Sequence, residues 1–230
     1  FICVLALLPV QASDDAASPT PENDDQKVLY ALGMMVSNNM KNFAFKPSEI
    51  ELILAGLKDG LQGMEPKVDM AVYGPKIQPM MQSRASAATE REKAAGAAFL
   101  ASAEKAEGAV KSASGLIYTE IEAGTGEVPS ASDTVRVHYV GTFRDGEMFD
   151  SSREAGEPAD FPLERVAPCF SEGLQKMKVG GKAKLVCPPD LAYGDRGIPG
   201  RIPGGAVLVF EVELLEIIPQ IGAPGAAGES

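Results

Sequence analysis

The spacing of the apolar residues changes once along the chain, and this change limits the folds that the chain can adopt. Before about residue 112, apolar side chains recur every three or four positions, whereas after it they alternate with polar ones. The first spacing places apolar residues on one face of a helix, and the second places them on one face of a strand. The sequence therefore predicts an α+β protein with a helical N-terminal half and a C-terminal antiparallel β-sheet packed against one short helix.

Residues 26–68 are predicted to form two amphipathic helices. The apolar stripe of the first helix consists of Leu29, Leu32, Val36, Met40 and Phe43. The second helix begins at a capping box of Ser48 and Glu51, and its stripe consists of Ile50, Ile53, Leu54, Leu57 and Leu61. Because two helices of this length are too small to enclose a core alone, we expect them to form a dimerisation module with a second copy of the chain. The alternative is that they dock on the C-terminal half.

Residues 69–113 are predicted to form one long connecting helix. The segment is rich in alanine, which favours helix, but it has few large apolar side chains. A helix with so thin an apolar face is expected either to cross solvent as a connector or to pack on a partner. Pro75 and Pro79 are expected to kink this helix or to delay its start.

The C-terminal half contains the predicted strands. Residues 116–121 and 133–141 alternate in polarity, and Asp145-Gly146 is a turn signal. Residues 182–188 and 206–217 are also predicted to be strands, the second of them long and strongly apolar. Phe170, Leu174 and Met177 lie at helical spacing and predict the one short helix.

Both ends of the chain are predicted to lie outside the folded domains. Residues 1–12 are apolar but too few to span a bilayer as a helix. We interpret them as the remainder of a secretion signal with the cleavage site Val10-Gln11-Ala12, the alternative being a buried strand or helix. The polar residues 13–25 are predicted to be a disordered leader, and residues 220–230, rich in Gly and Ala, a disordered tail.

Cys169 and Cys187 remain in the chain after such a cleavage. An even pair in an oxidising compartment is compatible with a disulfide. The interpretation that we favour is that the two are small buried apolar residues, with the disulfide as the alternative.

The residue pattern argues against most familiar kinds of catalytic site. The single histidine, His138, lies between Val137 and Tyr139 on a predicted strand, so it points away from their face and is expected to be half-exposed. The sequence contains no nucleophile elbow, no glycine-rich phosphate loop and no spacing typical of metal ligands. The formal net charge of -11 argues against a nucleic-acid partner. We therefore expect no metal and no cofactor.

Four strings in the C-terminal half form a more specific pattern. In chain order they are VHYVG, DGEMFDSS, GLQKMKVGGKAKLVCPPDLAYG and IPGGAVLVFEVELL. Together they resemble the FKBP-type peptidyl-prolyl cis/trans isomerase domain, over residues 114–219. Upstream, the helical pair, the alanine-rich segment with GAAFL, and SGLIYTEIEAGTG resemble the macrophage infectivity potentiator (Mip) and FkpA-like branch of that family. The branch implies a V-shaped homodimer formed by the N-terminal helices and a location in the bacterial periplasm or cell envelope.

The resemblance implies a pocket with catalytic and substrate-binding positions. The catalytic positions would be Tyr139, Phe149, Asp150, Tyr193 and Phe210. The substrate-binding positions would be Phe161, Val166, Ala167, Phe170, Ile198 and Ile202. The implied partners are proline-containing unfolded or exported polypeptides, together with inhibitors of the macrolide type.

Three residues depart from the family pattern. Phe170 stands where tryptophan is most common, Ala167 where a larger aliphatic residue is usual, and Cys169 where glycine is common. The loss of backbone freedom at Cys169 is expected to affect the start of the short helix. We expect the fold to be retained, with a wider pocket and weaker activity or inhibitor binding.

Two side chains are expected to make the polar contacts of this pocket. The Tyr193 hydroxyl would hold the substrate carbonyl. Asp150 would either accept a hydrogen bond from Tyr139 or polarise the bound amide, the alternative being a structural turn residue. In the loop at residues 191–205, Ile198 and Ile202 are expected to form an apolar lip, rather than part of a passive connector.

The predicted function is isomerisation of X–Pro bonds during the folding of exported proteins, with chaperone activity from the dimeric cleft. The alternative is a binding chaperone with weak or no isomerase activity.

Overall fold

The computed structural model describes residues 19–38 and 40–218, apart from the side chain of Asn42. The predicted signal remnant (1–12), the first part of the predicted leader (13–25) and the predicted tail (220–230) lie outside the described residues. The chain divides into two compact units, Phe1–Ser37 and Asn38–Ser230. None of the helices in the described ranges combines the length and the hydropathy that a bilayer-spanning helix needs.

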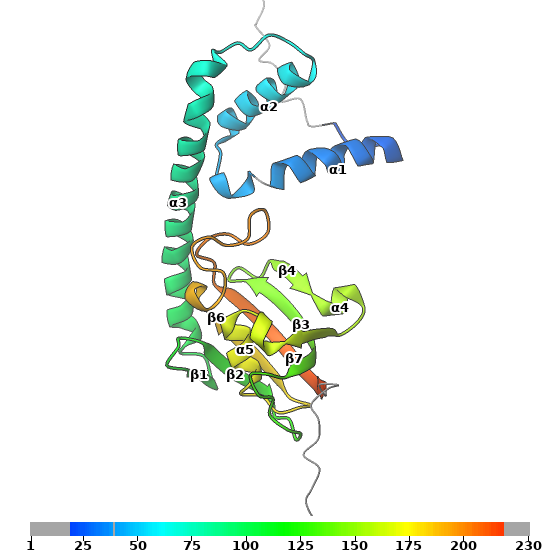
Figure 1. Ribbon diagram of the computed structural model, residues 1–230, viewed down its shortest axis with the longest axis vertical. Helices are drawn as coiled ribbons and strands as arrows, with labels where there is room; N and C mark the ends of the chain where they lie inside the picture. Colours follow the sequence, from blue (N-terminus) through cyan, green and yellow to red (C-terminus); the bar gives the residue numbers. More distant parts are fainter. Residues whose placement is uncertain (1–18, 39, 219–230) are drawn as a thin grey trace, which may run out of the picture. The chain divides into compact units, whose positions relative to one another are not determined.

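Helix α1 (Asp24–Asn38) forms the described part of the first unit (Figure 1, blue). It begins slightly before the predicted start at residue 26, and Asp24 and Asp25 lie in its first turn, where the helix dipole favours negative charge. No residue of α1 is buried, and its apolar side chains include Val28, Leu29 and Met35, each about two thirds exposed. The predicted amphipathic helix is therefore present, with its apolar face uncovered.

Helix α2 (Pro47–Leu61) follows the short 3-10 helix η1 (Lys41–Phe43) in the second unit. Its start differs from the predicted capping box at Ser48 and Glu51, because Pro47 occupies the first helical position, where its missing N–H is not needed. The Lys46 backbone N–H instead donates to the Glu49 carboxylate at 2.8 Å. No residue of α2 is buried, and Leu52 is 75% exposed.

Helix α3 (Met70–Ala103) is continuous and begins immediately after Asp69, whose side chain accepts a hydrogen bond from the Ala71 N–H at 2.8 Å. Pro75 and Pro79 lie inside it. The expectation that they delay the start of the helix is therefore wrong. The helix ends at Ala103 rather than at residue 113. Gly108, with φ of 73°, turns the chain into a strand that pairs with the sheet, which a continuing helix would prevent.

Seven strands form one antiparallel sheet in the described part of the chain, in the order β1-β2-β6-β7-β3-β4, with β5 paired to β3. Their bounds are β1 Ala109–Lys111, β2 Ile117–Glu122, β3 Thr134–Phe143, β4 Met148–Ser151, β5 Ala159–Pro162, β6 Lys182–Cys187 and β7 Leu208–Ile218. The longest pairing joins β3 to β7. The predicted antiparallel sheet is therefore confirmed, although β1, β4 and β5 were not predicted as strands.

The short helix α5 (Pro168–Leu174) covers one face of this sheet (Figure 1). Its Leu174 side chain and the nearby Met177 are almost completely buried, in the same core cluster as Val137, Leu185 and Leu214 of three strands. The α+β fold predicted from the change of period is confirmed. The sheet also carries a one-turn helix, α4 (Ser152–Ala155), that the apolar pattern did not indicate.

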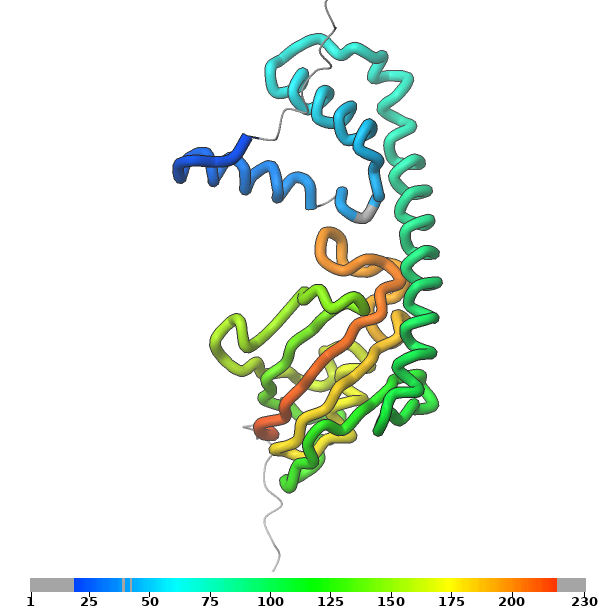
Figure 2. Tube along the Cα trace, turned by 180° about the vertical axis from the view of Figure 1, so that it is seen from behind, coloured from blue at the N-terminus to red at the C-terminus, as the bar shows by residue number. Residues whose placement is uncertain are grey.

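The C-terminal end of α3 packs on the other face of the sheet, as the two opposite views show (Figures 1 and 2). Phe99, Leu100 and Ala103 contact a second buried cluster that includes Val207 and Val209. At Gly96, an added Cβ would lie 2.8 Å from a Val207 methyl group, so a glycine permits this close approach. The expectation that this helix crosses solvent or packs on a partner is thus wrong for its last turns, because Phe99 and Leu100 pack on the sheet and Gly96 lets the helix approach it closely.

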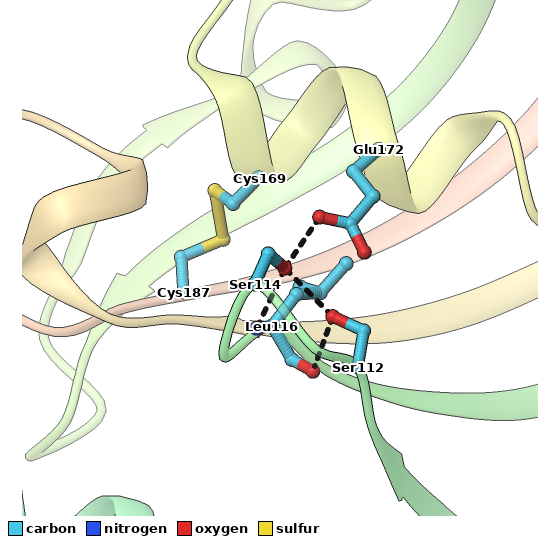
Figure 3. Close-up of a disulfide and its surroundings, with 6 residues drawn as sticks. All are labelled: Ser112, Ser114, Leu116, Cys169, Glu172 and Cys187. Atoms are coloured by element: carbon cyan, nitrogen blue, oxygen red, sulfur yellow. Dashed lines mark hydrogen bonds between the residues drawn. A yellow bond between two sulfur atoms is a disulfide. The ribbon is translucent and has the colours of Figure 1, made fainter.

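Cys169 of α5 and Cys187 at the end of β6 form a disulfide (Figure 3). Both residues are buried, as predicted, and their Cα atoms are 5.7 Å apart. The interpretation as two separate thiols is wrong. The pairing depends on where α5 crosses β6, which neither local sequence contains.

Candidate functional site

A cavity of about 310 Å³ lies between the sheet and α5. Its size falls at the lower end of the range of ligand pockets. Strands β3, β4, β5 and β7, helix α5 and the loop after η3 (Pro189–Leu191) all contribute to its wall. Its lining consists of Tyr139, Phe149, Asp150, Phe161, Pro162, Arg165, Val166, Ala167, Phe170, Tyr193 and Phe210.

Aromatic rings form most of the apolar wall. Phe170 is 5% exposed and meets Phe210 at 5.1 Å and Phe161 at 5.5 Å between ring centroids, edge to face in both cases. Tyr139 packs on Phe161 at 5.5 Å, and Phe149 packs on Phe210 at 5.7 Å. Edge-to-face pairs of this kind are favourable beyond their burial and fix the ring positions. Phe170 therefore forms the floor of the cavity.

Gly141 makes room for these rings, and the sequence reasoning did not identify it. In the sheet register it lies opposite Asp150 of β4 on one side and Phe210 of β7 on the other. An added Cβ would lie 2.7 Å from the Phe149 ring and 3.1 Å from the Phe210 ring. A side chain at this position would push both rings into the cavity.

Asp150 is the polar centre of the site. Its Oδ2 accepts a hydrogen bond from the Tyr139 hydroxyl at 2.9 Å and lies 3.0 Å from the guanidinium of Arg201. The first of the two predicted roles for Asp150 is therefore present. Burial raises the pKa of Tyr139 to about 12, and the hydrogen bond to the Asp150 carboxylate adds to this rise. Tyr139 is thus a neutral hydrogen-bond donor at physiological pH.

Tyr193 lies at the mouth of the cavity and is 41% exposed. It follows η3 and precedes Gly194, whose φ of 57° lies in the left-handed region that glycine adopts without strain. Within residues 19–38 and 40–218, its hydroxyl has no hydrogen-bond partner. This hydroxyl is therefore available to a bound substrate.

The loop after Tyr193 is held to α3 by polar contacts at Asp195. Lys93 of α3 forms an ion pair with Asp195 at 2.6 Å, and the Thr89 hydroxyl donates to the Asp195 carbonyl at 3.5 Å. Ile198 and Ile202 pair with each other through their backbones, and Ile202 is 3% exposed in the main core. Neither isoleucine lines the cavity, so the predicted apolar lip is not formed by them.

The cavity lining contains every other predicted position together with two residues that the sequence reasoning missed. Val166 and Ala167 line it where predicted, beside Pro162 and Arg165, which were not predicted. Arg201 reaches Asp150 from the loop. The local sequence does not indicate that such charged residues reach the site, because their contacts depend on how the loop folds back.

Other chemistry has no support among residues 19–38 and 40–218. His138 lies 3.1 Å from the Ser152 hydroxyl and does not line the cavity. Within these ranges, no three acidic, histidine or cysteine residues are grouped so that they could hold a metal ion. The arrangement is an apolar enclosure with a few fixed polar groups at its edge.

Two family models match the chain. Residues 126–215 match the model described as FKBP-type peptidyl-prolyl cis-trans isomerase, and this range contains every residue that lines the cavity. Residues 25–119 match the model described as the domain amino terminal to FKBP-type peptidyl-prolyl isomerase, which includes α2 and α3.

Curated relatives and solved structures agree with these matches. FkpA of Escherichia coli K12 is 38% identical over 226 residues, which cover 93% of this chain and 83% of the relative. The outer membrane protein MIP of Legionella longbeachae is 36% identical over 93% of both chains. The crystal structure of E. coli FkpA matches with a TM-score of 0.65 over 87% of this chain and 99% of that chain. The structure of a peptidyl-prolyl cis-trans isomerase from Pseudomonas syringae, 38% identical, matches with a TM-score of 0.53 over 56% of this chain and 95% of that one.

Proposed function

This chain belongs to the FKBP-type peptidyl-prolyl cis/trans isomerases, and we propose that the aromatic cavity described above is its active site. The observation that carries the proposal is the enclosure by Phe161, Phe170 and Phe210, with Asp150 and Tyr193 at its edge. Phe170 was expected to widen the pocket. The enclosure is nevertheless continuous at this position, because the Phe170 ring contacts the rings of both Phe161 and Phe210.

The reaction explains why such a cavity is sufficient. The barrier between the two isomers of a peptide bond is about 18–20 kcal/mol and reflects lost amide resonance. The twisted transition state has less charge separation than the planar amide, so water stabilises the planar state more. Transfer of the bond into an apolar site therefore lowers the barrier, and no proton has to move.

The side chains of the cavity divide this work. The phenylalanine rings enclose the proline ring and exclude water. The Tyr193 hydroxyl donates a hydrogen bond to the substrate carbonyl, which holds the chain while the bond rotates. Asp150 keeps Tyr139 and the loop residue Arg201 in place at the edge of the site. Asp150 therefore contributes both by positioning Tyr139 and Arg201 and by its own negative charge.

The proposal is tested by the cis-to-trans rate of a proline peptide with wild type and Tyr193→Phe. We expect strong catalysis by the wild type and roughly a tenfold lower kcat/KM in the variant, because one hydrogen bond to the substrate is lost. Tyr73→Phe on α3, which is also about half exposed and lies outside the cavity, is the matched control and should keep full activity. Equal rates for all three proteins would remove Tyr193 from the site. An inactive folded wild type would favour the binding-chaperone function instead.

We also propose that the N-terminal helices assemble two copies of the chain. This is supported by the uncovered apolar side chains of each helix, such as Met35 of α1 and Leu52 of α2, which are 69% and 75% exposed. Apolar surface of this extent normally marks an interface. A cleft between two such copies would hold unfolded chains, which is how we explain chaperone activity. The relative named outer membrane protein MIP supports a location in the bacterial envelope, where the clients would be exported polypeptides.

Sedimentation equilibrium tests this assembly. At micromolar concentration, we expect the wild type to have twice the mass of one chain, and the double variant Met35→Glu/Leu52→Glu to have the mass of one. Buried carboxylates at a dimer interface are costly, so at least a hundredfold weaker association is expected. Arg91→Glu, an exposed change on α3, should remain dimeric. A wild type that sediments as a single chain would contradict the proposal.

A further inference from the structure

One charged residue of the cavity has no partner in the part of the chain that the structure describes. Arg165 ends the short 3-10 helix η2 (Leu163–Arg165), lines the cavity and is exposed. The other charged residue of the lining, Asp150, is already neutralised by the Arg201 guanidinium at 3.0 Å. Arg165 forms no ion pair within residues 19–38 and 40–218, and its neighbour Glu164 neither pairs with it nor lines the cavity. The mouth of the cavity therefore carries one uncompensated positive charge.

Other arginines near the sheet behave differently. Arg136 is paired with Asp160 at 2.7 Å, and Arg144 is paired with Glu92 at 2.9 Å. Both of these guanidinium groups donate two hydrogen bonds to a carboxylate of the same chain. The guanidinium of Arg165, in contrast, keeps its planar set of N–H donors free for a group that enters the site.

We propose that Arg165 gives the enzyme a preference for X–Pro bonds that have an acidic residue next to the proline. This inference rests on the cavity being the active site. When the proline ring occupies the aromatic enclosure, the side chains flanking it must leave through the mouth, where Arg165 lies. A glutamate or aspartate there meets a guanidinium that can hold it with two parallel hydrogen bonds. A lysine at the same place is repelled.

The preference must be local, because the charge of the whole chain acts against it. A formal net charge of -11 repels acidic peptides at long range. Since Arg165 is exposed, its contact with a carboxylate is screened, and a preference of roughly two- to fivefold for glutamate over glutamine is expected. It should decline as ionic strength rises.

The test is the isomerisation of two peptide series, in which glutamate, glutamine or lysine stands either immediately before or immediately after the proline. The readout is the ratio of kcat/KM for the glutamate and glutamine peptides, which does not change when a variant simply lowers the amount of folded enzyme. In at least one series, we expect the wild type to prefer glutamate roughly two- to fivefold at low salt. Arg165→Gln should bring that ratio to about one or below, and Arg165→Glu should reverse the order so that the lysine peptide is best.

Arg91→Gln is the matched control, because it removes the same charge from an exposed position on α3 that does not line the cavity. It should leave the ratio as in the wild type. A wild-type ratio of one or less in both series would overturn the proposal, as would an identical fall of the ratio in Arg91→Gln and Arg165→Gln. Absence of catalysis on every peptide would instead overturn the active-site assignment, so the two failures are distinguishable.

Discussion

Asp150→Leu is expected to lower kcat/KM for a proline peptide by up to about a hundredfold while the protein remains folded. The substitution removes the acceptor of the Tyr139 hydroxyl and the anionic partner of Arg201 in one step. Each lost hydrogen bond of this kind costs on the order of 1–3 kcal/mol, and each 1.4 kcal/mol corresponds to a tenfold change in rate. The measurement is the cis-to-trans rate with wild type and variant at equal concentrations of folded protein.

Two further variants show whether the loss comes from the site itself. Asp150→Asn keeps an oxygen that can accept from Tyr139 but removes the charge that holds Arg201, so roughly a tenfold loss is expected. Asp160→Leu breaks a carboxylate–arginine pair with Arg136 on β3 and β5, outside the cavity, and should leave the rate unchanged. If Asp160→Leu slows the reaction as much as Asp150→Leu does, the effect is not specific to the cavity and the role assigned to Asp150 is wrong.

The elements that carry Tyr139, Phe170 and Phe210 could be predicted from the sequence, because their strands and helix have regular periods. The assignment of these residues to one pocket came from the resemblance. The resemblance also supplied Phe149, whose segment was not predicted to be a strand although it forms β4 and lines the cavity. Periodicity therefore gave the elements, and the resemblance gave the site.

The loop at residues 191–205 could not be predicted in the same way. Ile198 and Ile202 were expected at the lip because apolar residues in a glycine- and proline-rich loop commonly meet a ligand. In the structure the loop turns back, buries Ile202 in the core and directs Arg201 to Asp150. Periodicity contains no information about such a reversal, since it depends on contacts between distant segments, including the one from Lys93 to Asp195.

The packing of α3 escaped prediction for a different reason. Its last turns were expected to be solvated because they contain few large apolar residues. Gly96 instead allows the helix backbone to approach the sheet closely, so that the few large side chains of this end, Phe99 and Leu100, suffice for an interface. A measure of apolar area alone does not detect this kind of contact.

Removal of the disulfide is expected to lower the free energy of unfolding by about 3 kcal/mol. Cys169 and Cys187 are 18 residues apart, and closing a loop of that length restricts the unfolded chain by about this amount. For a domain of roughly 100 residues, the melting temperature should fall by about 10–20 °C. The measurement is urea and thermal unfolding of Cys169→Ala/Cys187→Ala beside the wild type.

A reducing agent provides the control that separates the covalent bond from the loss of two buried sulfur atoms. Dithiothreitol should destabilise the wild type almost as far as the double variant and leave the double variant itself unchanged. Because Cys169 immediately precedes Phe170 on α5, the bond also ties the floor of the cavity to β6. Reduced wild type should therefore lose isomerase activity at a lower temperature than the oxidised protein, in step with its unfolding. Equal stability of the wild type with and without reductant, together with two titratable thiols in the untreated protein, would show that the bond is absent.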